Sequence, residues 1–133
     1  MTYAFDAGPM IAYLTGEDGS EVAERILLEN PAQCYAHVFN LAEIYYIFLR
    51  RRGVNAAEEA LRTLYGAGII PRDDADDVFW KSAATFKGLH ALALPDGFCL
   101  ALGQRLKATV VTTDHTEFDP LVTLGYCPIL FIR

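Results

Sequence analysis

The sequence predicts an α/β protein, a single-domain three-layer α/β/α sandwich whose central sheet is mainly parallel. Short apolar runs alternate along the chain with segments of helical periodicity, and no repeat, linker or low-complexity tract interrupts them. Strands separated by helices are typical of βαβ units, which build parallel sheets with helices on both faces. The 133 residues, 53% of them apolar, have the size and balance of one domain, residues 1–133.

The first half of the chain supplies two strands and three helices. Thr2–Phe5 is a short apolar strand, and the helix after it has Pro9 near its start, where the missing N–H costs little. A second helix covers Glu21–Glu29. Gln33–His37 is the second strand, and it leads directly into a long helix over Val38–Arg52 that ends at a glycine.

The second half repeats the alternation. Asn55, followed three residues later by Glu58, resembles a capping box and predicts a helix from there to about Tyr65. Beyond it we expect strands and helices in the order Gly68–Pro71 (strand), Asp74–Leu92 (helix), Gly97–Lys107 (helix), Thr109–Thr113 (strand), a short helix from Pro120, and Ile129–Ile132 (strand).

Composition limits the possible compartments and partners. The N-terminus has no basic segment followed by an apolar one, and no apolar stretch is long enough to span a membrane, so we expect a soluble, cytoplasmic protein. Three widely spaced cysteines (Cys34, Cys99, Cys127) indicate reduced core residues rather than disulfides or a zinc site. The formal net charge of −6 argues against nucleic-acid binding unless divalent cations bind to the carboxylates.

Two aspartates follow predicted strands directly. Asp6 comes after the first strand and Asp114 after the fourth, so both should lie at the carboxyl edge of the sheet, where ligands bind in such folds. Aspartate is also common in strand-to-helix turns, where its side chain accepts hydrogen bonds from nearby backbone N–H groups. The position of either residue alone therefore leaves a structural role and a functional role equally open.

Two further carboxylates lie in apolar surroundings. Glu43 is in the first turns of a helix that is apolar almost all round, and a buried glutamate needs either a metal or a cation such as Arg50, seven residues on. Asp96 follows a proline at a predicted helix start, where an N-cap role would explain it without any chemistry. Most other acidic residues lie on polar helical faces.

If Asp6, Glu43, Asp96 and Asp114 converge, their mutual repulsion requires a cation. An all-oxygen set without histidine or cysteine favours Mg²⁺ or Mn²⁺, and His115, although adjacent to Asp114, receives no metal role. Such an ion activates water and binds phosphate oxygens during phosphodiester hydrolysis.

Four segments in this order carry a resemblance to a known family. They are FDAGPMIAYL, VFNLAEIYYIFLRR, LPDGFCLAL and VVTTDHTEFDPL, and together with a last strand they span nearly the whole chain. The sequence resembles a PIN-domain ribonuclease, and within that family a VapC-like toxin of a toxin–antitoxin pair. By this resemblance, Asp6, Glu43, Asp96 and Asp114 match the family's acidic residues, and Thr112 matches a hydroxyl residue that often precedes the last acid.

The resemblance implies a single PIN-like domain with Mg²⁺- or Mn²⁺-dependent endoribonuclease activity on single-stranded or loop RNA. It also implies a homodimer and an antitoxin protein that blocks the site. In this interpretation Asp6, Asp96 and Asp114 hold or orient the metal, and Glu43 completes its shell or positions the water. Arg50, Arg51 and Arg52 contact phosphate, unless they only complement the helix C-terminus.

The chain departs from the family pattern in one place. Ala7 and Gly8 follow the first aspartate, where the family often has serine or threonine, so a supporting hydrogen bond is missing from the expected set. Of the remaining acids near Asp114, we expect Glu117 to face solvent and Asp119 to cap the short helix at Pro120, although Asp119 is also a possible extra acid.

Two other classes of protein remain open. A phosphatase or phospho-acceptor domain also has aspartate after its first strand, but the phosphatase needs a second aspartate where this chain has Gly8. A catalytically degenerate, PIN-like protein-binding module would use the aromatic residues between Phe39 and Phe48 and at Phe79–Trp80 as a groove for a partner helix, unless they form ordinary core. The RNA target and the partner's identity do not follow from the sequence.

Overall fold

The computed structural model describes all 133 residues and has a five-stranded parallel sheet at its centre. The strands are β1 (Tyr3–Phe5), β2 (Cys34–His37), β3 (Ile69–Arg72), β4 (Thr109–Thr112) and β5 (Ile129–Phe131). Their order in the sheet is β3-β2-β1-β4-β5, and every neighbouring pair is parallel. The predicted sandwich is confirmed, and the sheet is parallel throughout.

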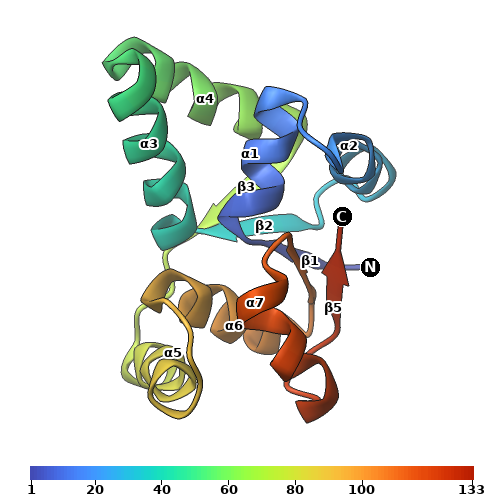
Figure 1. The fold of residues 1–133 in the computed structure, drawn as a ribbon, viewed down its shortest axis with the longest axis vertical. Helices are drawn as coiled ribbons and strands as arrows, with labels where there is room; N and C mark the ends of the chain where they lie inside the picture. The colour runs from blue at the N-terminus through green and yellow to red at the C-terminus, as the bar shows by residue number, and fades with distance from the viewer.

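Helices cover both faces of this sheet (Figure 1). One layer holds α1 (Ala7–Thr15), α2 (Ser20–Glu29), α3 (Val38–Arg52) and α4 (Val54–Ala67), and the other holds α5 (Asp77–Leu89), α6 (Leu94–Leu106) and α7 (His115–Phe118), which a 3-10 helix η1 (Asp119–Leu124) extends. No helix of the structure is long and apolar enough to cross a membrane.

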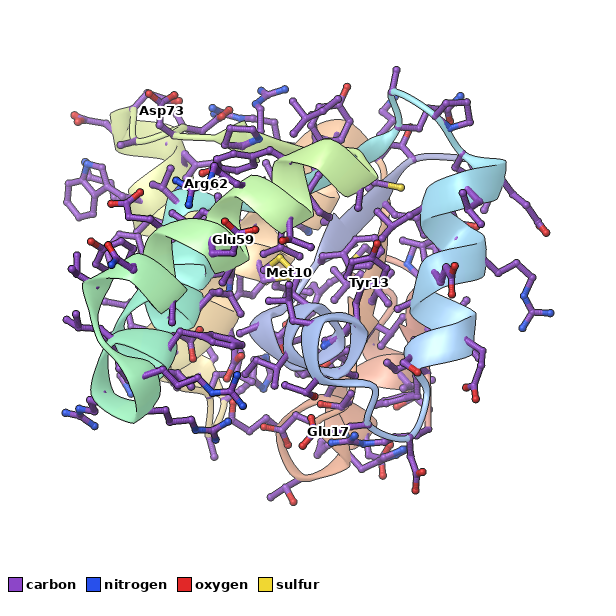
Figure 2. The ribbon with its side chains drawn as sticks, turned by 90° about the horizontal axis from the view of Figure 1, so that it is seen from above. Met10, Tyr13, Glu17, Glu59, Arg62 and Asp73 are labelled. Atoms are coloured by element: carbon purple, nitrogen blue, oxygen red, sulfur yellow. The ribbon has the colours of Figure 1, made fainter.

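Alternate residues of the strands pack into two separate hydrophobic cores, one on each face of the sheet, as expected for a sheet buried on both faces. Phe5 and Val111 pack in the core beneath α1 to α4, whereas Ala4 and Val110 pack in the core beneath α5 and α6. In Figure 2 Met10 lies between α1 and α4, and its side chain is 1% exposed. This packing fixes both helical layers against the sheet and so fixes the helix starts along its carboxyl edge.

Several predicted boundaries are corrected by the structure. The helix predicted from Asn55 begins at Val54, with Gly53 as N-cap and no side-chain cap, so the capping box is wrong; Glu58 instead accepts a hydrogen bond from the Tyr45 hydroxyl, 3.1 Å away. The helix predicted over Asp74–Leu92 covers only Asp77–Leu89, because Asp76 caps its start by accepting from the Phe79 N–H.

The helix that carries Asp96 starts three residues earlier than predicted, at Leu94. Gly97 lets this helix approach α5 closely, since a Cβ at this position would lie 2.6 Å from the carbonyl oxygen of Ala83. The close approach places the first turn of α6, with Asp96, beside the carboxyl ends of the central strands.

Candidate metal-dependent active site

The strand order reverses direction at β1, because β1 pairs with β2 on one side and with β4 on the other. In open parallel sheets, ligands bind outside the carboxyl ends of the strands at such a switch point. Asp6 follows β1 directly and Asp114 lies two residues beyond the end of β4. The two aspartates therefore lie on neighbouring strands at this switch point, as predicted.

Asp6 is held from three sides. Its Oδ1 atom accepts a hydrogen bond from the Ala7 N–H at 2.9 Å, which caps α1, and its Oδ2 atom accepts from the Thr112 hydroxyl, also at 2.9 Å. The Asn40 amide nitrogen lies 3.4 Å from Oδ1. The side chain is only 4% exposed, so its orientation is fixed by these donors rather than by solvent.

Three carboxylates come together beside Asp6. Oxygen atoms of Asp96, Asp114 and Glu117 all lie within 4.8 Å of one another. Two ligand oxygens on one Mg²⁺ lie at most about 4.2 Å apart, since each is about 2.1 Å from the ion. A small movement of the side chains would therefore bring this group onto a single ion.

Glu117 was not expected in this group, and the prediction that it faces solvent is wrong. Its backbone N–H donates to Asp114 Oδ1 at 3.0 Å, so Asp114 caps α7 and turns the Glu117 side chain into the site. Asp114 therefore has the structural role expected of an aspartate in a strand-to-helix turn, and it also belongs to the carboxylate group. The three-residue spacing between Asp114 and Glu117 was the available sequence signal, because residues at that spacing lie on one face of a helical turn.

Asp96 does not cap its helix. The N-cap of α6 is Ala93, Pro95 lies in the first turn, and Asp96 follows it with its side chain 8% exposed. The N-cap explanation for Asp96 is therefore wrong. A carboxylate this buried, next to two others, needs either protons or a cation.

Glu43 points an unpartnered oxygen into buried space. Its Oε1 atom is buried and has no hydrogen-bond partner. The pKa of Glu43 is raised to about 7, mainly by burial and in addition by the charges of Asp6 and Glu117. Arg50 forms no salt bridge with Glu43; its guanidinium carbon lies 5.2 Å from the centroid of the Tyr46 ring. The ion-pair explanation for Glu43 is therefore wrong.

Asn40 joins three elements around the site and was missed by the sequence analysis. It is 0% exposed, and its amide nitrogen donates to Asp6 Oδ1 and, at 3.2 Å, to the carbonyl of Pro95 in the first turn of α6. Its Oδ1 atom is buried without a partner. Asn40 precedes Glu43 by three residues, so the helical period placed the two side chains on one face of α3.

His37, also missed, fixes the start of α3. Its Nδ1 atom accepts a hydrogen bond from the Phe39 N–H at 3.1 Å, which caps α3, and its Nε2 atom lies 2.8 Å from the carbonyl oxygen of Asp74. Because Nδ1 is an acceptor, the ring is neutral with its proton on Nε2. Burial lowers the pKa of His37, which agrees with this tautomer.

Thr112 takes the role of the hydroxyl that is missing after Asp6. It is 0% exposed, donates to Asp6 Oδ2 and accepts from the Asp114 N–H at 3.1 Å. A side chain at Gly8 has no room, since a Cβ there would lie 2.0 Å from the Thr113 hydroxyl oxygen. The supporting hydrogen bond thus comes from β4 instead of from the start of α1.

Burial is the main cause of the raised pKa of Asp6, which is about 6. The hydrogen bonds from Thr112 and Ala7 lower this pKa, and the charges of Asp114 and Glu117 raise it. At neutral pH the site therefore holds more negative charge than its surroundings stabilise. A bound divalent cation would relieve this strain.

The residues fit a hard divalent cation. All candidate ligands are oxygens, the carboxylates are buried or half-buried, and two buried acceptor atoms, Asn40 Oδ1 and Glu43 Oε1, have no donor within the protein. Mg²⁺ and Mn²⁺ prefer carboxylate and carbonyl oxygens and keep several waters, which could donate to such acceptors. His115 is not a candidate metal ligand, because its ring nitrogens contact Asp119 and the Arg133 carbonyl.

Asp119 has neither of the two roles considered for it. It is the first residue of η1, whose N-cap is Phe118 without a side-chain cap, and its carboxylate contacts His115 Nδ1 at 2.9 Å. Its side chain is 58% exposed and does not belong to the carboxylate group. Phe118 is 0% exposed and anchors this turn in the core, as expected.

Two cavities of the structure lie away from the carboxylates. Cavities of about 380 Å³ and 200 Å³ lie elsewhere, the first between α5, α6 and Tyr126, and the second between α1, α3 and α4. None of the five acidic site residues lines either cavity.

Thr112→Val should weaken the site without unfolding the protein. The substitution keeps the shape of the side chain but removes the hydroxyl that donates to Asp6 and accepts from Asp114, so we expect Mn²⁺ affinity to fall on the order of tenfold. Titration with Mn²⁺ at constant pH measures this. Thr109→Val is the control, because Thr109 is also buried in β4 but lies at its other end. Equal losses in both variants would show that Thr112 acts only through packing.

Comparison with known proteins identifies the family. The model of the PIN domain family matches residues 3–119, which is most of the chain, and the chain belongs to this family. A search of curated proteins found no significant match.

Solved structures share the fold at low sequence identity. A toxin–antitoxin complex from Klebsiella pneumoniae is 17% identical with a TM-score of 0.73, and the match covers 99% of this chain and 98% of that one. VapBC2 from Rickettsia felis, bound to a promoter DNA fragment, is 17% identical with a TM-score of 0.73, and the match covers 98% of both chains. VapC20 of Mycobacterium tuberculosis, described as a toxin that cleaves the sarcin–ricin loop, is 16% identical with a TM-score of 0.73. The match covers 90% of this chain and 95% of that one. The fold is thus that of VapC-type PIN proteins.

Proposed function

We propose that this protein is a Mg²⁺- or Mn²⁺-dependent endoribonuclease that hydrolyses RNA phosphodiester bonds, and that it is the toxin of a toxin–antitoxin pair. The observation that carries the proposal is the convergence of Asp96, Asp114 and Glu117 within 4.8 Å, beside the buried Asp6 and the unpartnered oxygen of Glu43. A protein-binding module has no use for three carboxylates this close together, because their repulsion costs stability.

Each residue has a separate role in this mechanism. Asp96, Asp114 and Glu117 would hold the ion, and Asp6, oriented by Thr112 and Asn40, would complete the set. The bound ion supplies charge that stabilises the phosphate oxygens and lowers the pKa of a water molecule. Glu43, whose pKa is about 7, is suited to accept the proton from the attacking water through its free Oε1 atom.

The partner protein is also part of the proposal. Among the similar structures, those from Klebsiella pneumoniae and Rickettsia felis are toxin–antitoxin assemblies. By analogy, we propose that an antitoxin binds this chain and blocks the carboxylates, and that the toxin forms a homodimer. The cavity between α1, α3 and α4 contains Leu14, Phe48 and Ala60 together with Arg52 and Glu59, and this lining suits an amphipathic peptide segment.

The test is the mapping of RNA ends. Total cellular RNA is incubated with partner-free protein and Mg²⁺ or Mn²⁺, and new 5′ ends are sequenced, with a chelator arm as control. We expect discrete new ends that appear only with the metal. Random fragments at the level of the chelator arm, from protein that is folded, would contradict the proposal.

A further inference from the structure

Glu43 lies on an exposed stripe of α3 that continues beyond the carboxylates. Phe39, Glu43, Tyr46 and Arg50 follow one another at spacings of four, three and four residues. At about 100° per residue, these four positions fall within an arc of about 60° on the helix. Phe39 is 41% exposed and Tyr46 is 45% exposed, so two aromatic rings flank Glu43 on the surface. We call Phe39, Tyr46 and Arg50 the α3 stripe.

Both rings of the α3 stripe are supported from one side. The Phe39 ring stacks on Phe98 with 4.1 Å between centroids and 25° between planes. The Tyr46 ring lies beneath the Arg50 guanidinium, 5.2 Å from its carbon atom. Rings that are held in place in this way lose little freedom when a planar group stacks on them.

The same helix ends in unpaired positive charge. Arg50, Arg51 and Arg52 are exposed, and none forms a salt bridge, whereas Arg62, Arg72 and Arg105 each pair with aspartate or glutamate. By the same helical spacing, Arg51 and Arg52 lie about 100° and 200° around the helix from Arg50, so Arg50 is the one that adds positive charge to the stripe, in a chain with a net charge of −6. The helix dipole favours cations at this end but does not explain the exposed rings next to them.

We propose that the α3 stripe binds single-stranded RNA, with bases stacked on Phe39 and Tyr46 and the backbone held by Arg50. This inference rests on the proposed function. Stacking on aromatic rings accepts any base, and arginine side chains contact the phosphates, which is how proteins hold single strands. Because Glu43 lies between the two rings, a strand that passes over the carboxylates has bases on either side of the reacting phosphate. A duplex hides its base faces and is excluded.

A second protein molecule on the same face is the competing occupant, because Val38 and Leu49 on α3 are also exposed. The charges favour RNA. A polyanion pairs with Arg50, whereas a second copy offers only Glu43, beside its own stripe, as a counter-charge. The two occupants differ in whether changes to the stripe alter RNA affinity or oligomeric state.

The experiment measures binding without cleavage. Fluorescence anisotropy follows a labelled single-stranded RNA of mixed sequence, and the same sequence as a duplex, with Asp96→Asn protein in chelator. We expect Tyr46→Ala with Arg50→Ala to raise the single-strand Kd by at least about tenfold, since each lost stacking ring costs about that much, and Tyr46→Phe to preserve it. The matched control is Tyr65→Ala with Arg25→Ala, because Tyr65 is 43% exposed on α4 and Arg25 is exposed on α2 without a salt bridge. The control should stay within about twofold of the parent, as a distant surface site does.

Three results would overturn the proposal. They are equal affinity for single strand and duplex, equal losses in the stripe variant and its control, or a shift from dimer to monomer in the stripe variant during sedimentation with no change in RNA affinity. Failure of the proposed function is separate. If the protein cuts RNA but binds it independently of the stripe, the proposed function holds and the RNA-binding role of the stripe is wrong. If the protein binds RNA through the stripe but never cuts it, the stripe's role holds and the proposed function is wrong.

Discussion

Asp96→Asn is expected to reduce RNA cleavage at saturating Mg²⁺ by at least about a hundredfold, because it replaces a charged oxygen by an amide within the group that we propose as the metal site. The side chain is 8% exposed, and its carboxylate oxygen lies within 4.8 Å of the Asp114 and Glu117 oxygens. Initial rates on a labelled single-stranded RNA measure the effect.

The control for this prediction is Asp73→Asn, which removes the same charge from an exposed position; Figure 2 shows Asp73 at the outer edge of the structure. Its rate should equal that of the wild type. The Asp96→Asn protein should unfold at the same urea concentration as the metal-free wild type or a higher one, because the substitution relieves repulsion between carboxylates. Cleavage by folded Asp96→Asn at the wild-type rate would remove Asp96 from the active site.

The stability of the metal-free protein is expected to fall as the pH rises from about 4 to 7. The folded protein holds its protons on Asp6 up to a pKa of about 6, against an ordinary value of 3.8, and on Glu43 up to about 7, against 4.5. The folded state therefore binds more protons than the unfolded chain in this window, and the stability present below the unfolded pKa is lost as pH rises through the folded pKa. For Asp6 the shift corresponds to about 3 kcal/mol.

Urea unfolding in chelator across this pH range measures the slope, and Asp6→Asn isolates the contribution of Asp6. The variant should lose less stability as the pH rises, because it lacks the titrating carboxyl of Asp6. The titrations of His37 and His115 are common to both proteins and do not affect the comparison. The lowered pKa of Asp74 and of Asp76, about 2 in each case, acts only below pH 3.8 and lies outside the window. Mg²⁺ should restore stability at pH 7. Identical slopes in wild type and Asp6→Asn would contradict the account.

The fold was predictable because local signals and the global arrangement agree. The helix over Val38–Arg52 was predicted with its observed bounds, since it starts directly after a strand and ends before a glycine. Helix starts were less predictable. Asn55 and Glu58 match a capping box in sequence, but α4 packs against α3 and begins one residue earlier, and Gly53 takes the capping position.

The site was predictable where a residue's place along a strand determines its place on the sheet. Asp6 and Asp114 follow β1 and β4, which are neighbours in the sheet, so their proximity follows from topology. Asn40 and Glu117 were missed because their role depends on the tertiary positions of α3, α6 and α7. Asn40 contacts the Pro95 carbonyl 55 residues further on, and no local pattern encodes that contact.

Arg50 illustrates how spacing alone can mislead. Its seven-residue separation from Glu43 is compatible with an ion pair, yet the guanidinium lies over Tyr46, which is closer along the helix and offers an exposed ring. The choice depends on desolvation, because Glu43 is half-buried while Arg50 remains in water. Glu43 thus keeps a free oxygen at the site.

Titration of the protein with Mn²⁺ at pH 8, followed by the electron paramagnetic resonance signal of the free ion, would show whether the carboxylates bind a metal ion. It needs neither substrate nor partner. We expect saturable binding to the wild type and to Asp73→Asn, with affinity reduced by at least about tenfold in Asp96→Asn, since ligand loss weakens such sites by this order. Absence of saturable binding to the wild type, or equal affinity in Asp96→Asn, would show that these carboxylates do not form a metal site.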